Sequence, residues 1–169
     1  MNAVRMPLTR IHRGAIATLS LALALSLSAC GSGNQAATRM VTQVTDGVDG
    51  SITTMGNQIN ARGFLIVAQP DGSGVVVGTI VNNASTEDAL LAMAANQGVA
   101  TLSSKSLPLL QGNPIIFSGA TSNASATIPT LNAQPGTRVK LQMFFAVAGE
   151  MTLDVLVRER SGEYAGVGA

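Results

Sequence analysis

The sequence predicts an all-β protein, an antiparallel β-sandwich of seven to nine strands. From Ser51 onward, short apolar runs recur about every ten residues, and turn residues such as Gly, Pro, Asn and Asp separate them. The two clearest runs alternate between apolar and polar residues, a pattern typical of strands with one buried and one exposed face. Strand–helix–strand spacing is absent, and the low content of charged residues, 11%, together with many Val, Ile and Thr residues favours a small β domain.

Residues 1–29 have the layout of a lipoprotein signal peptide. Basic residues at Arg5, Arg10 and Arg13 precede an apolar stretch, 15–28, that is too short to span a bilayer as a helix. The stretch ends in a lipobox, Leu27, Ser28 and Ala29, directly before Cys30. We expect cleavage before Cys30 and attachment of acyl chains such as palmitate to it, which would anchor the protein to the extracytoplasmic face of the cell membrane.

Residues 30–50 are predicted to be the lipidated cysteine and a flexible spacer, which opens with the small and polar residues GSGNQAAT. A spacer of about twenty residues has a mean reach of about 25 Å. Within it, the segment from Asp46 to Gly50 has a slight likeness to a calcium loop, but no third spaced carboxylate follows. We therefore expect a pair of turns there.

The β-sandwich domain is predicted to span residues 51–159. Its first hairpin joins Ile59–Ala68 to Val75–Val81 across a Pro-Asp-Gly turn. Further strands are expected at the later apolar runs, 98–103, 114–118, 124–130, 138–147 and 150–158. Residues 160–169 are predicted to be a frayed tail.

One segment, Ser85–Ala95, supports two interpretations. A Ser/Thr cap, acidic residues and then Ala, Leu and Met favour the start of a helix. Tertiary context often overrides such propensity, and the family resemblance described below favours a strand. The sequence leaves the choice open.

The residues offer little for catalysis or for nucleic-acid binding. Removing the three leader arginines leaves seven of the ten basic residues against nine acidic ones, a net charge of about −2, so no nucleic-acid partner is expected. The single histidine, His12, lies in the leader, which excludes histidine-based catalysis and the usual zinc sites from the mature chain. Glu87 and Asp88 are adjacent and are expected to form a solvated turn or cap. We predict that the protein is not an enzyme and that it holds no cofactor.

The methionines are the candidate metal ligands, because thioethers suit Cu(I). Met143 and Met151 lie on the clearest strands, where alternation predicts that both point inward and fill core volume. A thioether metal site would need at least two methionines that reach one surface. We therefore expect core packing at both positions.

Two stretches carry a resemblance to a known family: VVVGTIVNNASTEDALLAM, at 75–93, and PGTRVKLQMFFAVAGEMTLDVLVRE, at 135–159. They resemble the periplasmic copper chaperones of the PCu(A)C type, and more closely the actinobacterial lipoproteins of the LpqE type, which share the lipobox and spacer. This resemblance implies a cupredoxin-like or immunoglobulin-like sandwich and an actinobacterial plasma membrane. The chaperones bind copper through His and Met residues, but the corresponding segments here, VATLSSKS and ATSNASATI, contain neither, so no copper ligand carries over.

Two functions are therefore expected. The leading one is a lipid-anchored, non-catalytic binding or envelope-accessory module, whose partners are the membrane and an unknown envelope protein or ligand. The alternative is a copper-handling accessory protein with a rebuilt, methionine-based site on the copper-chaperone scaffold.

Overall fold

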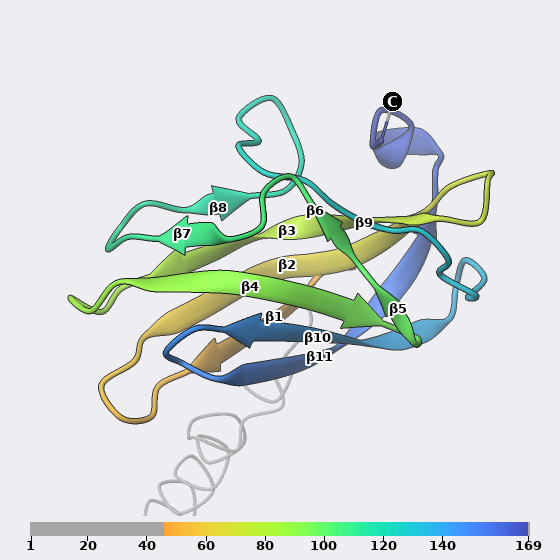
Figure 1. Ribbon diagram of the computed structural model, residues 1–169. Helices are drawn as coiled ribbons and strands as arrows, with labels where there is room; N and C mark the ends of the chain where they lie inside the picture. The colour runs from red at the N-terminus through yellow and green to blue at the C-terminus, as the bar shows by residue number, and fades with distance from the viewer. Residues whose placement is uncertain (1–45, 169) are drawn as a thin grey trace, which may run out of the picture. The chain divides into compact units, whose positions relative to one another are not determined.

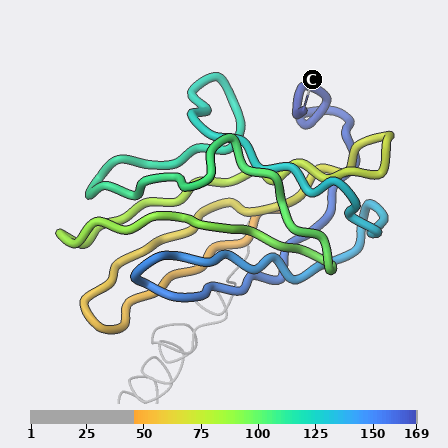
Figure 2. The backbone as a smooth tube through the Cα atoms, in the orientation of Figure 1, coloured from red at the N-terminus to blue at the C-terminus, as the bar shows by residue number. Residues whose placement is uncertain are grey.

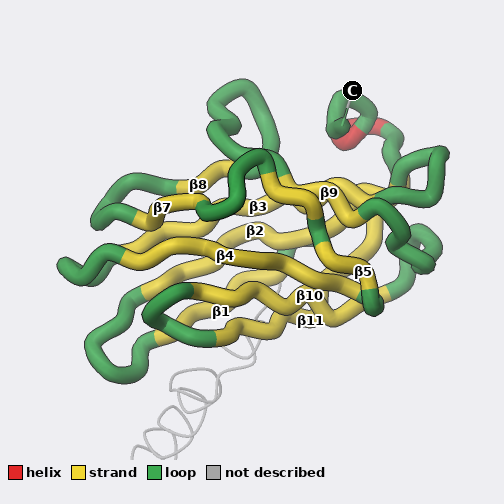
Figure 3. The backbone as a smooth tube through the Cα atoms, viewed as in Figure 1, coloured by secondary structure: helices red, strands yellow, loops and turns green. Residues whose placement is uncertain are grey.

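A computed structural model describes residues 46–168, which are almost entirely β-structure (Figures 1 and 3). One 3-10 helix, η1 (Gly162–Tyr164), follows the last strand, and none of the described helices is long and apolar enough to cross a membrane. The eleven strands among the described residues are β1 (Val48–Ile52), β2 (Ile59–Ala68), β3 (Gly74–Asn82), β4 (Asp88–Ala95), β5 (Gly98–Val99), β6 (Thr101–Leu102), β7 (Leu107–Leu109), β8 (Ile115–Ile116), β9 (Ala126–Ile128), β10 (Arg138–Phe145) and β11 (Glu150–Glu159).

The strands form two layers, which are joined where β11 pairs with β2. β1, β2, β3, β8, β9 and β6 make one layer, and β11, β10, β4, β5 and β7 make the other. β11 also pairs with β2, and this pairing is parallel. The all-β sandwich is confirmed, but it has more strands than the seven to nine expected and one parallel pair.

Apart from β1, the additional strands have only two or three residues, too few to leave a pattern in the sequence. The expected strand 98–103 divides at the buried Ala100 into β5 and β6, which belong to different layers. Ala100 donates a backbone hydrogen bond of 2.8 Å to Met93 at this crossing. A two-residue strand depends on its partners for its conformation, so local sequence reasoning could not separate the two.

The alternation predicted for β10 and β11 is present in the structure. The inward residues of these strands are buried: Val139, Leu141, Met143, Phe145, Met151, Leu153, Val155 and Val157. The two strands pair antiparallel along most of their length. Their apolar faces therefore supply much of the core, as period-two alternation indicates.

The ambiguous segment forms a strand, β4, and no helix. β4 lies between β10 on one side and β5 and β7 on the other. Its backbone groups thus pair with strands on both sides, and Leu90, Met93 and Ala95 are buried in the core. These tertiary contacts outweigh the helical propensity of the alanines and leucines.

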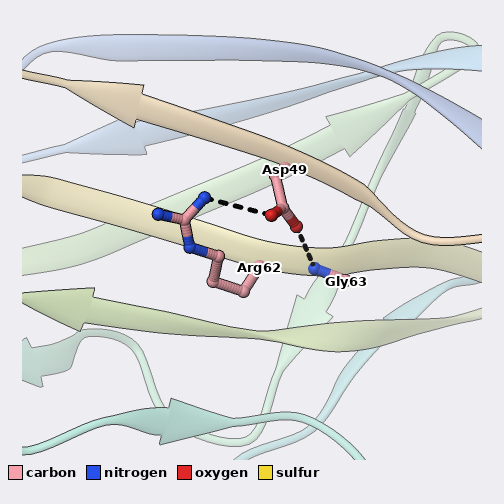
Figure 4. Close-up of polar contacts among 3 residues, drawn as sticks. All are labelled: Asp49, Arg62 and Gly63. Atoms are coloured by element: carbon pink, nitrogen blue, oxygen red, sulfur yellow. Dashed lines mark hydrogen bonds and ion pairs between the residues drawn. The ribbon is translucent and has the colours of Figure 1, made fainter. Parts of the chain in front are cut away.

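β1 begins inside the predicted spacer, so the expectation of turns at Val48 to Gly50 is wrong. Asp49 of β1 accepts hydrogen bonds from the Arg62 guanidinium at 3.0 Å and from the backbone N–H of Gly63 at 2.8 Å (Figure 4). Asp46 forms an ion pair of 3.2 Å with Arg158. Both carboxylates of the suggested calcium loop are therefore used to fasten the start of the domain.

The described part of the tail is packed against the domain, which corrects the prediction that it frays. The Arg158 guanidinium lies 5.8 Å from the centroid of the Tyr164 ring. The Gln69 side chain donates to the Val167 carbonyl at 3.3 Å. Burial, followed by the hydrogen bond and charge of Glu163, raises the pKa of Tyr164 above its usual value of 10.

The strand directions gather the connections at two opposite ends of the sandwich. Because β2 and β11 run parallel and their neighbours antiparallel, four connections lie at one end: 53–58, 83–87, 110–114 and 146–149. Figure 2 shows these four loops on the left. The β2–β3 and β4–β5 turns and the β9–β10 loop lie at the other end.

Candidate functional site

The predicted anchor lies outside the described residues. Leu27, Ser28, Ala29 and Cys30 all precede residue 46, so the cleavage site and the lipidated cysteine stay predictions from the sequence.

Met143 and Met151 are buried in the core, 0% and 6% exposed. Met143 lies directly opposite Met151 on one side and opposite Met93 on the other. The three residues, called here the methionine row, cross three neighbouring strands on the inner face of one layer. The sequence reasoning missed Met93 as a member, because only the strand assignment of β4 brings it into register.

β1 covers part of the methionine row. A Cβ atom added to Gly50 would lie 3.2 Å from the Met151 Sδ and 2.5 Å from the Leu153 Cδ2. Only glycine fits there without displacing the core side chains. The row is therefore packed against other residues and does not reach the surface.

The copper-ligand pattern of the chaperones is not reproduced. The described residues contain neither His nor Cys, and no group of three or more His, Cys, Asp or Glu side chains among them could hold a metal ion. The corresponding segments, VATLSSKS and ATSNASATI, form β5 and β6 and the region around β9. Thioethers are the only soft ligands that this part of the chain offers, and Met93, Met143 and Met151 are in the core.

Asp88 organises the end of the sandwich where β4 begins. Asp88 is only 7% exposed, and its Oδ1 accepts hydrogen bonds from the backbone N–H groups of Ala89 at 2.7 Å and Val147 at 2.8 Å. Its Oδ2 accepts a third, from Ala148, also at 2.8 Å. The expectation of a solvated turn is wrong for Asp88, although the neighbouring Glu87 is exposed.

Asn82 plays a matching part at the end of β3. Its fully buried side chain donates to the carbonyls of Thr86 at 2.8 Å and Leu109 at 3.0 Å, and its Oδ1 accepts from Ala84 at 2.9 Å. A buried amide with all of these partners holds the β3–β4 and β7–β8 loops in one arrangement. Asn82 and Asp88 together fix three of the four loops at this end.

Large apolar side chains are exposed at the same end. Five of the six exposed large hydrophobic residues in the described chain lie in these loops or beside them, whereas the sixth, Val99, lies at the opposite end. The five are called here the apolar end: Met55 (fully exposed), Val147 (56%), Leu91 (47%), Leu110 (40%) and Phe144 (36%). Exposed apolar side chains that gather on rigid loops indicate an interaction surface.

The sequence contained a partial signal for this surface. Phe144 interrupts the polar face of β10, and Val147 sits in the tight β10–β11 turn, where polar residues are usual. Leu91 and Leu110 could not be recognised, because the sequence did not establish which residues of β4 and the β7–β8 loop face outward.

No protein-family model and no curated protein matches the chain. Its fold is similar to the apo PCuAC domain from PmoF1, with a TM-score of 0.52 and 18% identity over 60% of this chain and 93% of that domain. It is equally similar to the copper-bound PCuAC domain from PmoF2, with a TM-score of 0.52 and 15% identity over 60% of this chain and 92% of that domain. At these identities the similarity shows the fold alone: this chain has the β-sandwich of the PCuAC domains.

Proposed function

We propose that this chain is a lipid-anchored, non-catalytic binding protein of the cell envelope that holds a protein partner through its apolar end. The observation that carries the proposal is that five exposed apolar side chains lie at the end of the sandwich where Asp88 and Asn82 fix three of the four loops. Loops that are already ordered lose little conformational entropy when a partner binds.

The position of the expected tether supports a protein partner over the lipid surface itself. The chain enters the domain at Asp46, which pairs with Arg158 near the end of β11, whereas the apolar end lies at the start of that strand. Residues 150–158 span about 26 Å at about 3.3 Å per residue. The attachment point at Asp46 and the apolar end therefore lie apart on the domain, which leaves the apolar end open to another envelope protein.

Site-specific photo-crosslinking in cells tests this function. A photo-reactive residue at position 147 or 91 is expected to give a discrete adduct, because both positions are exposed at the apolar end. The control is position 134, which is also exposed and lies in the β9–β10 loop at the opposite end. Phe144→Ser should weaken the adducts at 147 and 91. Adducts of equal yield at 134, or none at 147 and 91, would contradict the proposal.

Copper handling is a second candidate, and the methionine row is the observation that favours it. Three thioethers in register on adjacent strands offer a soft ligand set suited to Cu(I), and one of the similar folds is a copper-bound PCuAC domain. The row is buried, so a copper ion would have to pass between packed strands and remain charged in the core. This cost places copper handling second.

A Cu(I) competition titration separates the two candidates. The full chain in detergent is titrated against a colorimetric Cu(I) chelator, alone and as Met93→Leu, Met143→Leu and Met151→Leu. A copper site at the row would be established if the original chain and the exposed control Met55→Leu withdraw one equivalent of copper from the chelator and the three core variants do not. If the chain withdraws no copper from the chelator, the copper-handling candidate is excluded. The crosslinking experiment then decides whether the partner-binding function is correct.

A further inference from the structure

We propose that the end of the sandwich opposite the apolar end binds a neutral saccharide, in an open cleft of about 410 Å³ between the β4–β5 turn and the segment that follows β9. The cleft is lined chiefly by Asn96, Gln97, Val99, Pro129, Thr130 and Asn132. The site is independent of the partner-binding function proposed above, because it shares none of the residues of the apolar end.

The two walls of the cleft are held at a fixed spacing. The Asn96 side-chain amide donates to the carbonyls of Leu131 and Asn132, both at 2.9 Å. A Cβ atom added to Gly98 would lie 2.8 Å from the Ile128 Cγ2 and 2.9 Å from the Thr130 carbonyl oxygen, so only glycine permits this approach. The cleft is therefore preformed by contacts between the turn and the segment after β9.

Unfavourable backbone conformations are concentrated at this cleft. Four non-glycine residues in the described chain have a positive φ, and three of them line it: Asn96 at 47°, Gln97 at 71° and Asn132 at 50°. Asparagine tolerates this region, but a two-residue turn with both φ values positive strongly prefers glycine at its second position, where this chain has Gln97. Residues held in such conformations concentrate at ligand sites, where a side chain is kept for function at the expense of stability.

The lining selects the class of ligand. Gln97 and Asn132 carry carboxamides and Thr130 carries a hydroxyl, and such groups both donate and accept hydrogen bonds. The Asn96 side-chain nitrogen already donates to Leu131 and Asn132, so Asn96 offers its amide oxygen as an acceptor. Val99 and Pro129 add apolar surface, and no ionisable side chain lines the cleft. Neutral sugars match this lining, because each ring has hydroxyls that donate and accept and a face of C–H groups. A phosphate or carboxylate would find no cation to pair with.

The test is a ligand titration of the ¹⁵N-labelled full chain, monitored by NMR, in a zwitterionic detergent that contains no sugar. The probes are lactose, cellobiose and chitobiose, with glucose and galactose as their smaller counterparts and glucuronic acid as the charged control. With a neutral disaccharide we expect saturable chemical-shift changes at the backbone amides of Gln97, Thr130 and Asn132 and at the side-chain amides of Gln97 and Asn132, and none with glucuronic acid. Tighter binding of the disaccharide than of either monosaccharide would indicate a polymeric glycan as the source of the ligand, and equal binding a free sugar.

Glycine variants separate a ligand role from a structural one. Gln97→Gly and Asn132→Gly remove an amide but accept the positive φ, so each should bind at least tenfold more weakly while its Tm stays equal or rises. Gln97→Asn keeps a carboxamide that tolerates this backbone and should retain binding. Gln134→Ala, an exposed amide outside the cleft, is the control and should change neither quantity. The absence of saturable shifts with every neutral probe, or unchanged binding by both glycine variants, would overturn the proposal.

Discussion

Asp88 and Val147 lie 59 residues apart, yet the Asp88 Oδ1 accepts a hydrogen bond of 2.8 Å from the backbone N–H of Val147. The bond ties the first residue of β4 to the turn between β10 and β11. The buried Asp88 carboxylate thus fixes the backbone of Val147, whose side chain is exposed. A buried polar residue therefore shapes the surface through which we propose that the protein binds its partner.

Asp88→Asn should destabilise the protein by about 2 kcal/mol, because an amide offers one acceptor oxygen where the carboxylate satisfies three backbone N–H groups. Urea denaturation measures the change. Glu87→Gln is the control, since Glu87 is exposed, and should stay within about 0.5 kcal/mol of the original chain. Equal effects of the two variants would show that the Asp88 contacts contribute little to stability.

Asp49→Ala should loosen β1, because it removes the acceptor for both Arg62 and the Gly63 backbone. We expect a loss of about 1 kcal/mol and faster hydrogen exchange at the amides of 48–52. Arg62→Gln removes only the half-exposed ion pair and should cost about 0.5 kcal/mol or less. If Arg62→Gln had the larger effect, the ion pair would be the main contact that holds β1.

The phenol of Tyr164 should titrate above its usual pKa of 10, because burial and the neighbouring Glu163 both disfavour its charged form. The folded state therefore favours the protonated phenol, so this contribution to stability is present below pH 10 and is lost as the pH rises through the folded pKa. Tyr164 is the only tyrosine and the chain has no tryptophan, so tyrosinate absorbance reports on it alone. Glu163→Gln should lower the pKa part of the way. A midpoint equal to that of the urea-unfolded chain would mean that the tail is not packed in solution.

Met143→Leu should reduce stability by less than about 1.5 kcal/mol, whereas Met143→Ala should cost about 2–5 kcal/mol, because the side chain is fully buried and only the second change leaves a cavity. Thermal or urea unfolding gives both values. Met55→Ala, at a fully exposed position, is the control and should have little effect. A small cost for Met143→Ala would show that the methionine row is loosely packed, and would strengthen the copper candidate.

Cys30→Ala should abolish metabolic labelling with a palmitate analogue and leave an unprocessed precursor, because the cysteine sulfur is the expected site of acylation. Electrophoresis of labelled cells measures both effects. Ser32→Ala, a change just after the lipobox, should be processed and labelled normally. Persistent labelling of Cys30→Ala would refute the anchor.

Much of the fold could be predicted from periodicity alone. β2 has the bounds expected for it, and the alternation in β10 and β11 correctly assigned Met143 and Met151 to the core. β4 could not be assigned, because its helical propensity and its strand pairing oppose each other and only the second depends on distant residues. The start of β1 and the packing of the tail were missed for the same reason, since Arg62, Arg158 and Gln69 hold these segments from far along the chain.

The sequence by itself determined the class of the fold, the inward faces of the long strands and the expectation of a lipid anchor, because each of these is a local property of composition, alternation or motif. Only the tertiary structure decided the rest. It brought Met93 into register with Met143, turned Asp88 inward toward Val147, gathered the apolar end, and placed Gln97 beside Thr130 and Asn132. These relationships depend on strand order and register, which are set by the burial of all the strands at once and leave no trace in any one segment.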